Sequence, residues 1–244
     1  MSTSWNGVCK GKKLVKCGNN IIDCGGDRYI TEWINPTAYA SYQIVKESIP
    51  LAKRWQQEYV AYGYPLEHHL IYAIWGWVNK NISYKYDDRY PDYWNDVGET
   101  YSDRWGDCED SAIACTSAVE NFMRDNSKVK LAIGYVIMEG QLYGHAWCYY
   151  DSSVFNKRVV LECTYDDYVP PTTYIEGVRY HPTVVVSSRE WQVVCNCTWC
   201  QEMLNYLHGD DLREKMNWKR VEIRPEFKEA RRLTWYERLK NKVF

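Results

Sequence analysis

The order of helix-like and strand-like segments constrains this fold more than any other feature of the sequence. Apolar side chains recur at helical spacing over 65–80 and again over 107–125. Segments dense in Val, Ile and aromatic residues then follow one another, at 129–138, 143–150, 157–164 and 183–186. Helices grouped before strands predict an α+β fold with an antiparallel sheet, because a parallel sheet would need a crossover segment between successive strands.

Changes in composition divide the chain into three parts. Gly and Cys are frequent over 1–35, which predicts turns and short strands there. A core of helices and strands is expected over 36–188, and a cysteine cluster followed by a basic helical extension over 189–244. Inside the core, Pro50 is expected to end or kink the first helix, and 84–105 is expected to be a loop.

Length and charge exclude several classes of protein. The chain has 244 residues, a formal net charge of −2 and 45% hydrophobic residues, which fits a globular fold with its own core. No apolar run is long enough for a transmembrane helix and no secretory signal is recognisable, so a cytoplasmic or virion-associated protein is expected. The near-neutral charge gives no indication of nucleic-acid binding, and no membrane partner is expected.

Cys108 stands where a helix is expected to begin. Gly106 permits a tight turn and Asp107 is a good N-cap, so the Cys108 thiol would face unpaired backbone N–H groups. That position lowers the pKa of a thiol and favours the nucleophilic thiolate. A buried cysteine that only packs at a helix start is the alternative interpretation.

A hairpin between the second and third expected strands places a histidine beside an acid. Pairing Tyr150 with Lys157 across the loop sets the register. In that register His145 lies directly opposite Glu162 on one face of the sheet. A carboxylate there would accept the imidazole N–H and leave the other ring nitrogen for a thiol. A one-residue change of register would separate the two side chains, and a His–Glu pair without a catalytic role is the alternative.

Several short motifs between about residues 66 and 166 occur in a fixed order. They are Ile74-Trp75-Gly76-Trp77-Val78, Asn81-Ile82-Ser83-Tyr84, Asp92-Tyr93-Trp94, Gly106-Asp107-Cys108-Glu109-Asp110-Ser111-Ala112, Gly144-His145-Ala146-Trp147 and Leu161-Glu162-Cys163-Thr164. This series resembles the transglutaminase-like cysteine hydrolase superfamily in its microbial and phage form. The resemblance implies a papain-like core, with Cys108 as nucleophile, His145 as base and Glu162 as the third member.

The resemblance also implies a donor that stabilises the oxyanion. Trp94 is the best candidate, Tyr93 is the second, and the backbone N–H of Cys108 is a further donor. The family usually has Asp where this chain has Glu162. That departure leaves lesser candidates for the third member, namely Asp151, Asp166 and Asp167.

The implied reaction is thiol-dependent hydrolysis or acyl transfer at an amide, peptide or isopeptide bond, with hydrolysis expected over crosslinking and no cofactor in catalysis. Residues 87–110 carry nine Asp and Glu against two Arg. If they rim the cleft, they would favour an amine-bearing peptide or protein substrate; a solvated acidic loop is the alternative. Two alternatives to a thiol hydrolase remain. The first is a catalytically silent binding or virion-structural module, and the second is a metal site in which Cys108 and His145 are ligands.

Three other cysteines lie within six residues, at Cys195, Cys197 and Cys200. This C-x-C-x-x-C spacing could supply three ligands of a structural, tetrahedral zinc site. The candidates for a fourth ligand are His208, Cys9, Cys17 and Cys24. Disulfides and free thiols are the alternatives.

The remaining histidines are given no functional role. His68 and His69 are adjacent on an expected helix, so they do not share a helix face and are expected to be structural or at the surface. His181 precedes Pro182 in an expected turn and carries no signal of its own.

Overall fold

The computed structural model describes most of the chain. The described residues are 8–9, 14–17, 20–23, 28–85, 94–123, 127–138, 141–164, 178–195 and 197–207, and side chains are described from Ile30 onward except at position 206. The basic helical extension expected towards residue 244 lies outside the described residues.

Five α-helices lie within the described ranges. They are α1 (Tyr39–Glu58), α2 (Leu66–Asn81), α3 (Val97–Asp103), α4 (Cys108–Met123) and α5 (Thr198–Leu207). Two short 3-10 helices accompany them, η1 (Ile30–Trp33) and η2 (Val60–Tyr62). Helices α2 and α4 coincide with the two helices that apolar spacing predicts.

A five-stranded antiparallel sheet forms the other half of the fold. Its strands are β7 (Val129–Met138), β8 (Gln141–Ser152), β9 (Lys157–Leu161), β10 (Val178–Val186) and β11 (Trp191–Val193). They lie in the order β11-β10-β7-β8-β9, and every neighbouring pair is antiparallel. The predicted α+β fold with an antiparallel sheet is therefore confirmed.

Short strands form three separate pairs. Strand β1 (Val8–Cys9) pairs with β4 (Arg28–Tyr29), and β2 (Leu14–Cys17) pairs with β3 (Asn20–Asp23). These are short strands of the kind that the Gly-rich N-terminal segment predicts. Strand β5 (Ser83–Tyr84) pairs in parallel with β6 (Trp105–Gly106), immediately before α4.

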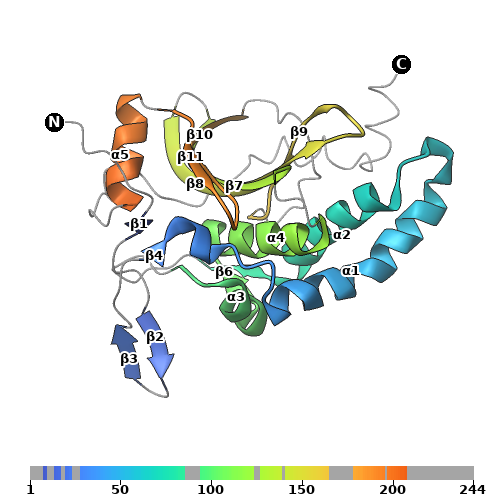
Figure 1. The fold of residues 1–244 in the computed structure, drawn as a ribbon, viewed down its shortest axis with the longest axis horizontal. Helices are drawn as coiled ribbons and strands as arrows, with labels where there is room; N and C mark the ends of the chain where they lie inside the picture. Colours follow the sequence, from blue (N-terminus) through green and yellow to red (C-terminus); the bar gives the residue numbers. More distant parts are fainter. Residues whose placement is uncertain are drawn as a thin grey trace.

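The long helices lie on one side of the sheet, with α4 directly against β7 and β8 and with α1 and α2 beside α4 (Figure 1). On β8, Ala146, Cys148 and Tyr150 belong to the clusters that the helices share with the sheet. Trp147 and Tyr149 belong to a cluster on the opposite face, as the alternation of side chains along a strand requires.

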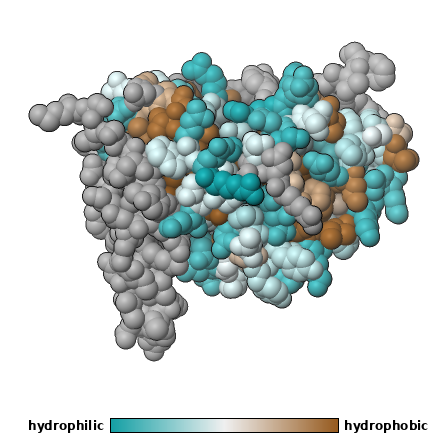
Figure 2. All heavy atoms as spheres, viewed as in Figure 1, coloured by the Kyte–Doolittle hydropathy of each residue, from teal (hydrophilic) through white to brown (hydrophobic). Residues whose placement is uncertain are grey.

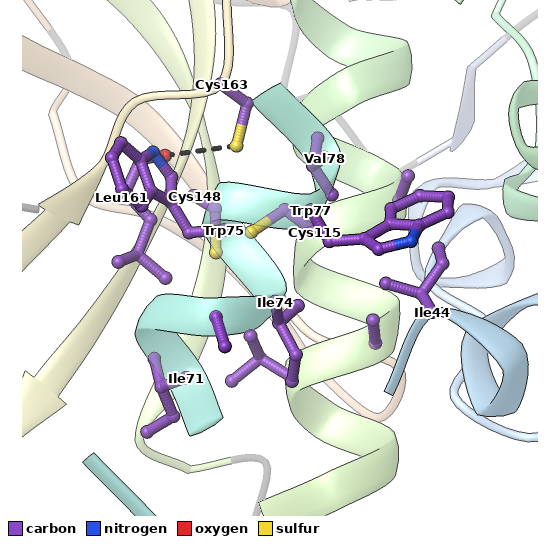
Figure 3. Packing of buried hydrophobic residues seen from close by; sticks show 14 of the residues in the cluster. Ile44, Ile71, Ile74, Trp75, Trp77, Val78, Cys115, Cys148, Leu161 and Cys163 are labelled. Atoms are coloured by element: carbon purple, nitrogen blue, oxygen red, sulfur yellow. Dashed lines mark hydrogen bonds between the residues drawn. The ribbon is translucent and has the colours of Figure 1, made fainter. Parts of the chain in front are cut away.

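Helix α2 is buried on nearly every side, since all its residues from His68 to Val78 are buried. Figure 3 shows Trp75 of this helix beside Cys115 of α4, Cys148 of β8 and Cys163, which follows β9. The Cys163 thiol donates to the Leu161 carbonyl over 3.4 Å (Figure 3). These three cysteines are therefore core residues of the cluster in which α2, α4 and β8 pack together.

Two expectations about the helices need correction. Helix α1 runs through Pro50 to Glu58, so the expectation that Pro50 ends the helix is wrong. Pro50 and Lys46, the residue whose carbonyl loses its partner, both lie on the exposed side, where water can bond to that carbonyl. Part of the expected loop at 84–105 is helix α3, which begins with a capping box. The Asp96 carboxylate accepts from the backbone N–H of Glu99, and the Glu99 carboxylate accepts from that of Asp96.

His68 and His69 were expected to be structural or at the surface. Both are buried, so they are structural residues of the core. The Tyr150 hydroxyl and His68 Nδ1 are 3.2 Å apart. Desolvation, followed by the charge of His69, lowers the pKa of His68 to about 4. His68 is therefore a neutral core group at ordinary pH.

The surface is mostly polar on the face that Figure 2 shows, where hydrophobic residues form separate patches among hydrophilic ones. The exposed large hydrophobic residues include Tyr39 and Tyr42 on α1 and Trp199 on α5. Within the described ranges, no helix combines the length and the apolar content that a bilayer crossing requires.

Candidate active site

The N-terminus of α4 is held by one carboxylate. Asp110 accepts from the backbone N–H of Asn95 at 2.6 Å, from the Asn95 side-chain amide at 2.9 Å and from the backbone N–H of Asp107 at 3.3 Å. Gly106 packs against this side chain so closely that a Cβ there would lie 2.6 Å from Asp110 Cβ. The glycine is therefore required for close packing, which fixes the helix start that Cys108 occupies.

Cys108 is the first residue of α4 and is only 5% exposed. Its thiol donates to the Glu109 carboxylate over 3.1 Å, and the Ala146 backbone hydrogen-bonds to the same sulfur. Because Ala146 follows His145 directly, the thiol lies against the strand that carries the candidate base. The structure thus brings the Cys108 thiol to β8, where the thiol bonds to Glu109 and to the Ala146 backbone rather than to the His145 ring.

The pKa of Cys108 is raised well above its ordinary value. Burial is the largest cause, and the carboxylates of Glu109 and Asp107 add to it. The hydrogen bond from the Ala146 backbone acts in the opposite direction without outweighing them. The expectation of a lowered thiol pKa is therefore wrong for this resting arrangement, because burial and two adjacent negative charges oppose the effect of the helix N-terminus.

His145 and Glu162 are in contact. His145 Nε2 lies 3.0 Å and 3.2 Å from the two oxygens of the Glu162 carboxylate, and both side chains are buried. The register differs from the predicted one, since Tyr150 pairs with Val159 instead of Lys157. The predicted contact still forms, because the observed register differs from the predicted one by two residues. An even difference leaves both side chains on the same face of the sheet.

Three side chains hold the Glu162 carboxylate in place. The hydroxyls of Tyr180 and Thr164 each donate to it over 2.7 Å, in addition to His145. Burial alone would raise the pKa of Glu162, but the charge and hydrogen bond of His145, together with both hydroxyls, lower it. Glu162 therefore remains ionised beside the imidazole.

The backbone of Glu162 is held separately by α2. Trp75 Nε1 donates to the Glu162 carbonyl over 2.6 Å, and the Asn79 amide donates to it over 3.1 Å. Sequence reasoning missed these contacts and also those of Tyr180 and Thr164. Thr164 could have been found, because it lies two residues from Glu162, whereas Tyr180 comes from a strand whose pairing the sequence does not specify.

The other predicted site residues lie in different surroundings. Trp94 shares a core cluster with Cys108, but it is completely buried and its ring meets that of Trp33 edge to face at 5.7 Å. Asp151 lies at the far end of β8, where it pairs with Arg158 at 3.1 Å, so it is not a third member. Tyr93, Asp166 and Asp167 lie outside the described residues.

The acidic residues of 87–110 do not all lie exposed around a cleft. Asp107, Glu109 and Asp110 are buried, and their carboxylate oxygens lie within 4.8 Å of one another, close enough to share a cation. Asp96 and Glu99 are engaged in the capping box of α3. The remaining acids of this stretch include Asp87, Asp88 and Asp92, which lie outside the described residues.

A second cluster of candidate metal ligands lies between strand β10 and the start of α5. His181, Cys195, Cys197 and Cys200 bring one imidazole nitrogen and three sulfurs within 4.8 Å of one another, an arrangement that could hold a metal ion. His181 takes the place expected for a fourth ligand, although sequence reasoning gave it no role. Of the residues expected there, His208 and Cys24 lie outside the described residues, and only the backbones of Cys9 and Cys17 are described.

Comparisons with known proteins give a distant structural likeness. No protein-family profile matches the chain, and no curated protein matches it. Two structures of Legionella pneumophila LapG, one of them EGTA-treated, are each 14% identical and cover 67% of this chain and 97% of the other, with TM-scores of 0.44 and 0.43. A calcium-bound structure of the same protein is 15% identical and covers 66% of this chain and 97% of the other, with a TM-score of 0.43. The assignment to the transglutaminase-like superfamily is accordingly a resemblance that rests on the motifs.

Proposed function

We propose that this chain is a transglutaminase-like thiol hydrolase that cleaves an amide, peptide or isopeptide bond with Cys108, His145 and Glu162. The observation that carries the proposal is the buried contact between His145 Nε2 and the Glu162 carboxylate. An ionised carboxylate only accepts hydrogen bonds, so Nε2 bears the proton and Nδ1 of a neutral ring is an acceptor. That tautomer suits a general base for the Cys108 thiol.

The reaction begins with transfer of the Cys108 thiol proton to His145 Nδ1 as the sulfur attacks the substrate carbonyl carbon. A carbon–sulfur bond forms and the carbonyl electrons move onto oxygen. The oxyanion then re-forms the carbonyl, the carbon–nitrogen bond breaks, and His145 returns its proton to the leaving amine. Water, with His145 again as base, attacks the thioester and releases the acid; an amine in place of water would give crosslinking.

The high pKa of Cys108 indicates that its proton moves during the attack rather than before it. In the resting arrangement the thiol proton points towards Glu109. For the proposed transfer the S–H group has to turn away from Glu109, and the thiol and His145 Nδ1 have to come within hydrogen-bond reach when substrate binds. Glu162 stabilises the imidazolium that forms, since its carboxylate stays ionised beside the ring.

The oxyanion is proposed to accept hydrogen bonds from the backbone N–H of Cys108 and from the indole N–H of Trp94. The backbone N–H at the first residue of α4 has no partner inside its own helix, because the first turn of any helix leaves its donors unused. Donors of this kind act on the charge that develops in the transition state.

The substrate is proposed to be a peptide or protein with a free amine near the scissile bond, and hydrolysis is proposed over crosslinking. Asp107 and Glu109 place negative charge beside the thiol, and this charge favours a cationic group in the substrate. The reaction as proposed needs no metal. The metal expected from the cysteine spacing, structural zinc, is proposed to lie away from the reacting atoms.

An acyl-enzyme experiment tests this proposal without knowledge of the natural substrate. The full chain is incubated with p-nitrophenyl acetate, and acetylation is located by mass spectrometry of the peptides. We expect a hydroxylamine-sensitive acetyl group on Cys108, which is lost in C108A and strongly reduced in H145Q. Addition of a primary amine then distinguishes a hydrolase, which releases acetate, from a transferase, which releases the acetyl amide.

A silent binding module is the competing function, and the burial of Cys108 and its raised pKa favour it. That alternative predicts acetylation of Cys108 no faster than that of the core thiol Cys115 in the same protein. Such a result, reproduced with a neutral thioester substrate, would overturn the proposed hydrolase.

A further inference from the structure

We propose that His181, Cys195, Cys197 and Cys200 bind one zinc ion, which fastens α5 and the segment before it to strand β10. The four residues come from three places in the chain. His181 lies in β10, Cys195 and Cys197 lie between β11 and α5, and Cys200 lies in the first turn of α5. The ion would therefore link strand β10 to helix α5.

The distances between the four donor atoms fit a tetrahedral ion. His181 Nε2 lies 3.2 Å, 3.6 Å and 3.4 Å from the sulfurs of Cys195, Cys197 and Cys200 in that order. The sulfurs of Cys197 and Cys200 lie 3.5 Å apart. Zinc bonds of about 2.3 Å to sulfur and about 2.0–2.1 Å to nitrogen place tetrahedral ligand atoms about 3.5–3.8 Å apart. The observed separations agree with this spacing to within a few tenths of an ångström.

The donor set favours zinc in a structural role. Three thiolates with one imidazole make one of the common closed zinc sites, which leave no position for water or substrate. The Thr183 hydroxyl donates to the Cys200 sulfur over 3.1 Å, the type of outer hydrogen bond that orients a metal ligand. A disulfide explains the arrangement less well, because it would join two sulfurs and leave the third beside an imidazole that approaches all three.

The backbone brings the ligands together independently of any ion. The pairing of β10 with β7 shifts between Pro182 and Val184, directly after His181. Beyond this irregularity the Val194 N–H donates to the Thr183 carbonyl over 2.9 Å, which holds the start of the cysteine segment against β10. The Tyr135 hydroxyl donates to the Trp199 carbonyl over 3.0 Å and so holds the first turn of α5 over β7.

The proposed ion would hold in place two elements next to the candidate active site, helix α5 and strand β10. Met203, Leu204 and Leu207 of α5 are buried in the same cluster as Cys108 (α5 is the orange helix beside the sheet in Figure 1). His181 also follows Tyr180, which donates to Glu162. An ion at His181 therefore restrains the strand that supplies this hydroxyl.

Metal analysis of the full chain tests the site directly. The protein is purified without chelator, and its zinc content is measured together with the number of free thiols after denaturation. We expect one zinc ion per chain, its loss in H181A and C200S, and its retention in C115A, which removes a buried thiol that is not one of the four candidate ligands. Because a ligand variant can fail to fold, the wild type is also exchanged with cobalt, which should give the intense visible bands of tetrahedral cobalt with thiolate ligands.

These readouts do not involve activity, so failure of the zinc site and failure of the hydrolase are distinguishable. A wild-type chain that contains no zinc and gives no tetrahedral cobalt spectrum would overturn the proposal. A disulfide between two of the three cysteines, located by mass spectrometry of unreduced peptides, would overturn it as well. Zinc retained in both H181A and C200S would show that the ion lies elsewhere.

Discussion

The Cys108 thiol donates its hydrogen to the Glu109 carboxylate, 3.1 Å away, and not to a base that could activate it. Glu109 is buried, and after burial itself its negative charge is the largest influence that raises the pKa of Cys108. The residue after the candidate nucleophile therefore keeps the thiol protonated in the resting protein. This relationship leads to the first prediction.

Replacing Glu109 with glutamine should increase the reactivity of Cys108. E109Q removes a negative charge next to the sulfur, which lowers the pKa of the thiol, and each pKa unit gives about tenfold more thiolate at neutral pH. We expect iodoacetamide to alkylate Cys108 several-fold faster at pH 7, measured by mass spectrometry. E120Q is the matched control, because Glu120 is a buried acid of the same helix that accepts from the Ser188 N–H instead. An unchanged rate in E109Q would contradict this electrostatic account.

Tyr180 should act as a positioning residue through Glu162. Y180F removes one of the hydrogen bonds that lower the pKa of Glu162, so this pKa should rise. Ionised Glu162 stabilises the imidazolium of His145, and this support is lost as the pH falls through the pKa of Glu162. Because that pKa is higher in Y180F, the reactivity of Cys108 should begin to fall at a higher pH in Y180F than in the wild type. Y143F is the control, since the Tyr143 hydroxyl donates to Gln141 and not to Glu162. If the reactivity of Cys108 fell with acid over the same pH range in Y180F and in Y143F, the role of Tyr180 would be contradicted.

Local patterns were sufficient to predict most of the fold. Apolar spacing identified α2 and α4, and strand-like composition identified β7, because each pattern reflects burial on one face of a local element. Helix α3 was missed although its Asp96 and Glu99 form a recognisable capping box. That α1 continues past Pro50 could not be predicted, because tolerance of a proline depends on which side of the helix is exposed, and that follows from packing.

Long-range pairing limited what could be predicted about the site. The contact between His145 and Glu162 followed from strand alternation, which tolerates an even error in register. Tyr180 and His181 could not be assigned, because their partners depend on how β10 pairs with β7 and on the irregularity after Pro182. The pKa of Cys108 was predicted with the wrong sign, since burial and the orientation of Glu109 are tertiary properties.

Acid should destabilise the protein through His68. Its pKa is about 4 in the folded state against an ordinary value of 6.5, so the unfolded chain binds the proton first as the pH falls. The free energy of unfolding should decrease between pH 6.5 and 4, with a contribution from His68 of at most about 3 kcal/mol. Urea denaturation at several pH values measures this slope. H68Q should flatten it between pH 7 and 5, and an equally steep slope in H68Q would contradict the assignment.

Gly134 should be required for the close approach of β10 to β7. A Cβ at this position would collide with the His181 carbonyl and lie 2.7 Å from the Thr183 backbone nitrogen. Because backbone atoms cannot move aside as a flexible side chain can, we expect G134A to lower the free energy of unfolding by about 1–3 kcal/mol or more. G98A is the control, since its Cβ would meet only the Asp96 carboxylate at 3.1 Å. Equal stability of the two variants, measured by urea denaturation, would rule out the predicted collision.

The central claim is that His145 acts on Cys108. It is tested most directly by the rate of iodoacetamide labelling at Cys108 in the wild type and in H145Q, followed from pH 5 to pH 10 with Cys115 as the internal reference. The account predicts that Cys108 reacts faster than Cys115, that its rate rises towards alkaline pH because its pKa is raised, and that H145Q slows it at least about tenfold while Cys115 is unaffected. Equal rates at Cys108 in the wild type and in H145Q across this range would contradict the account.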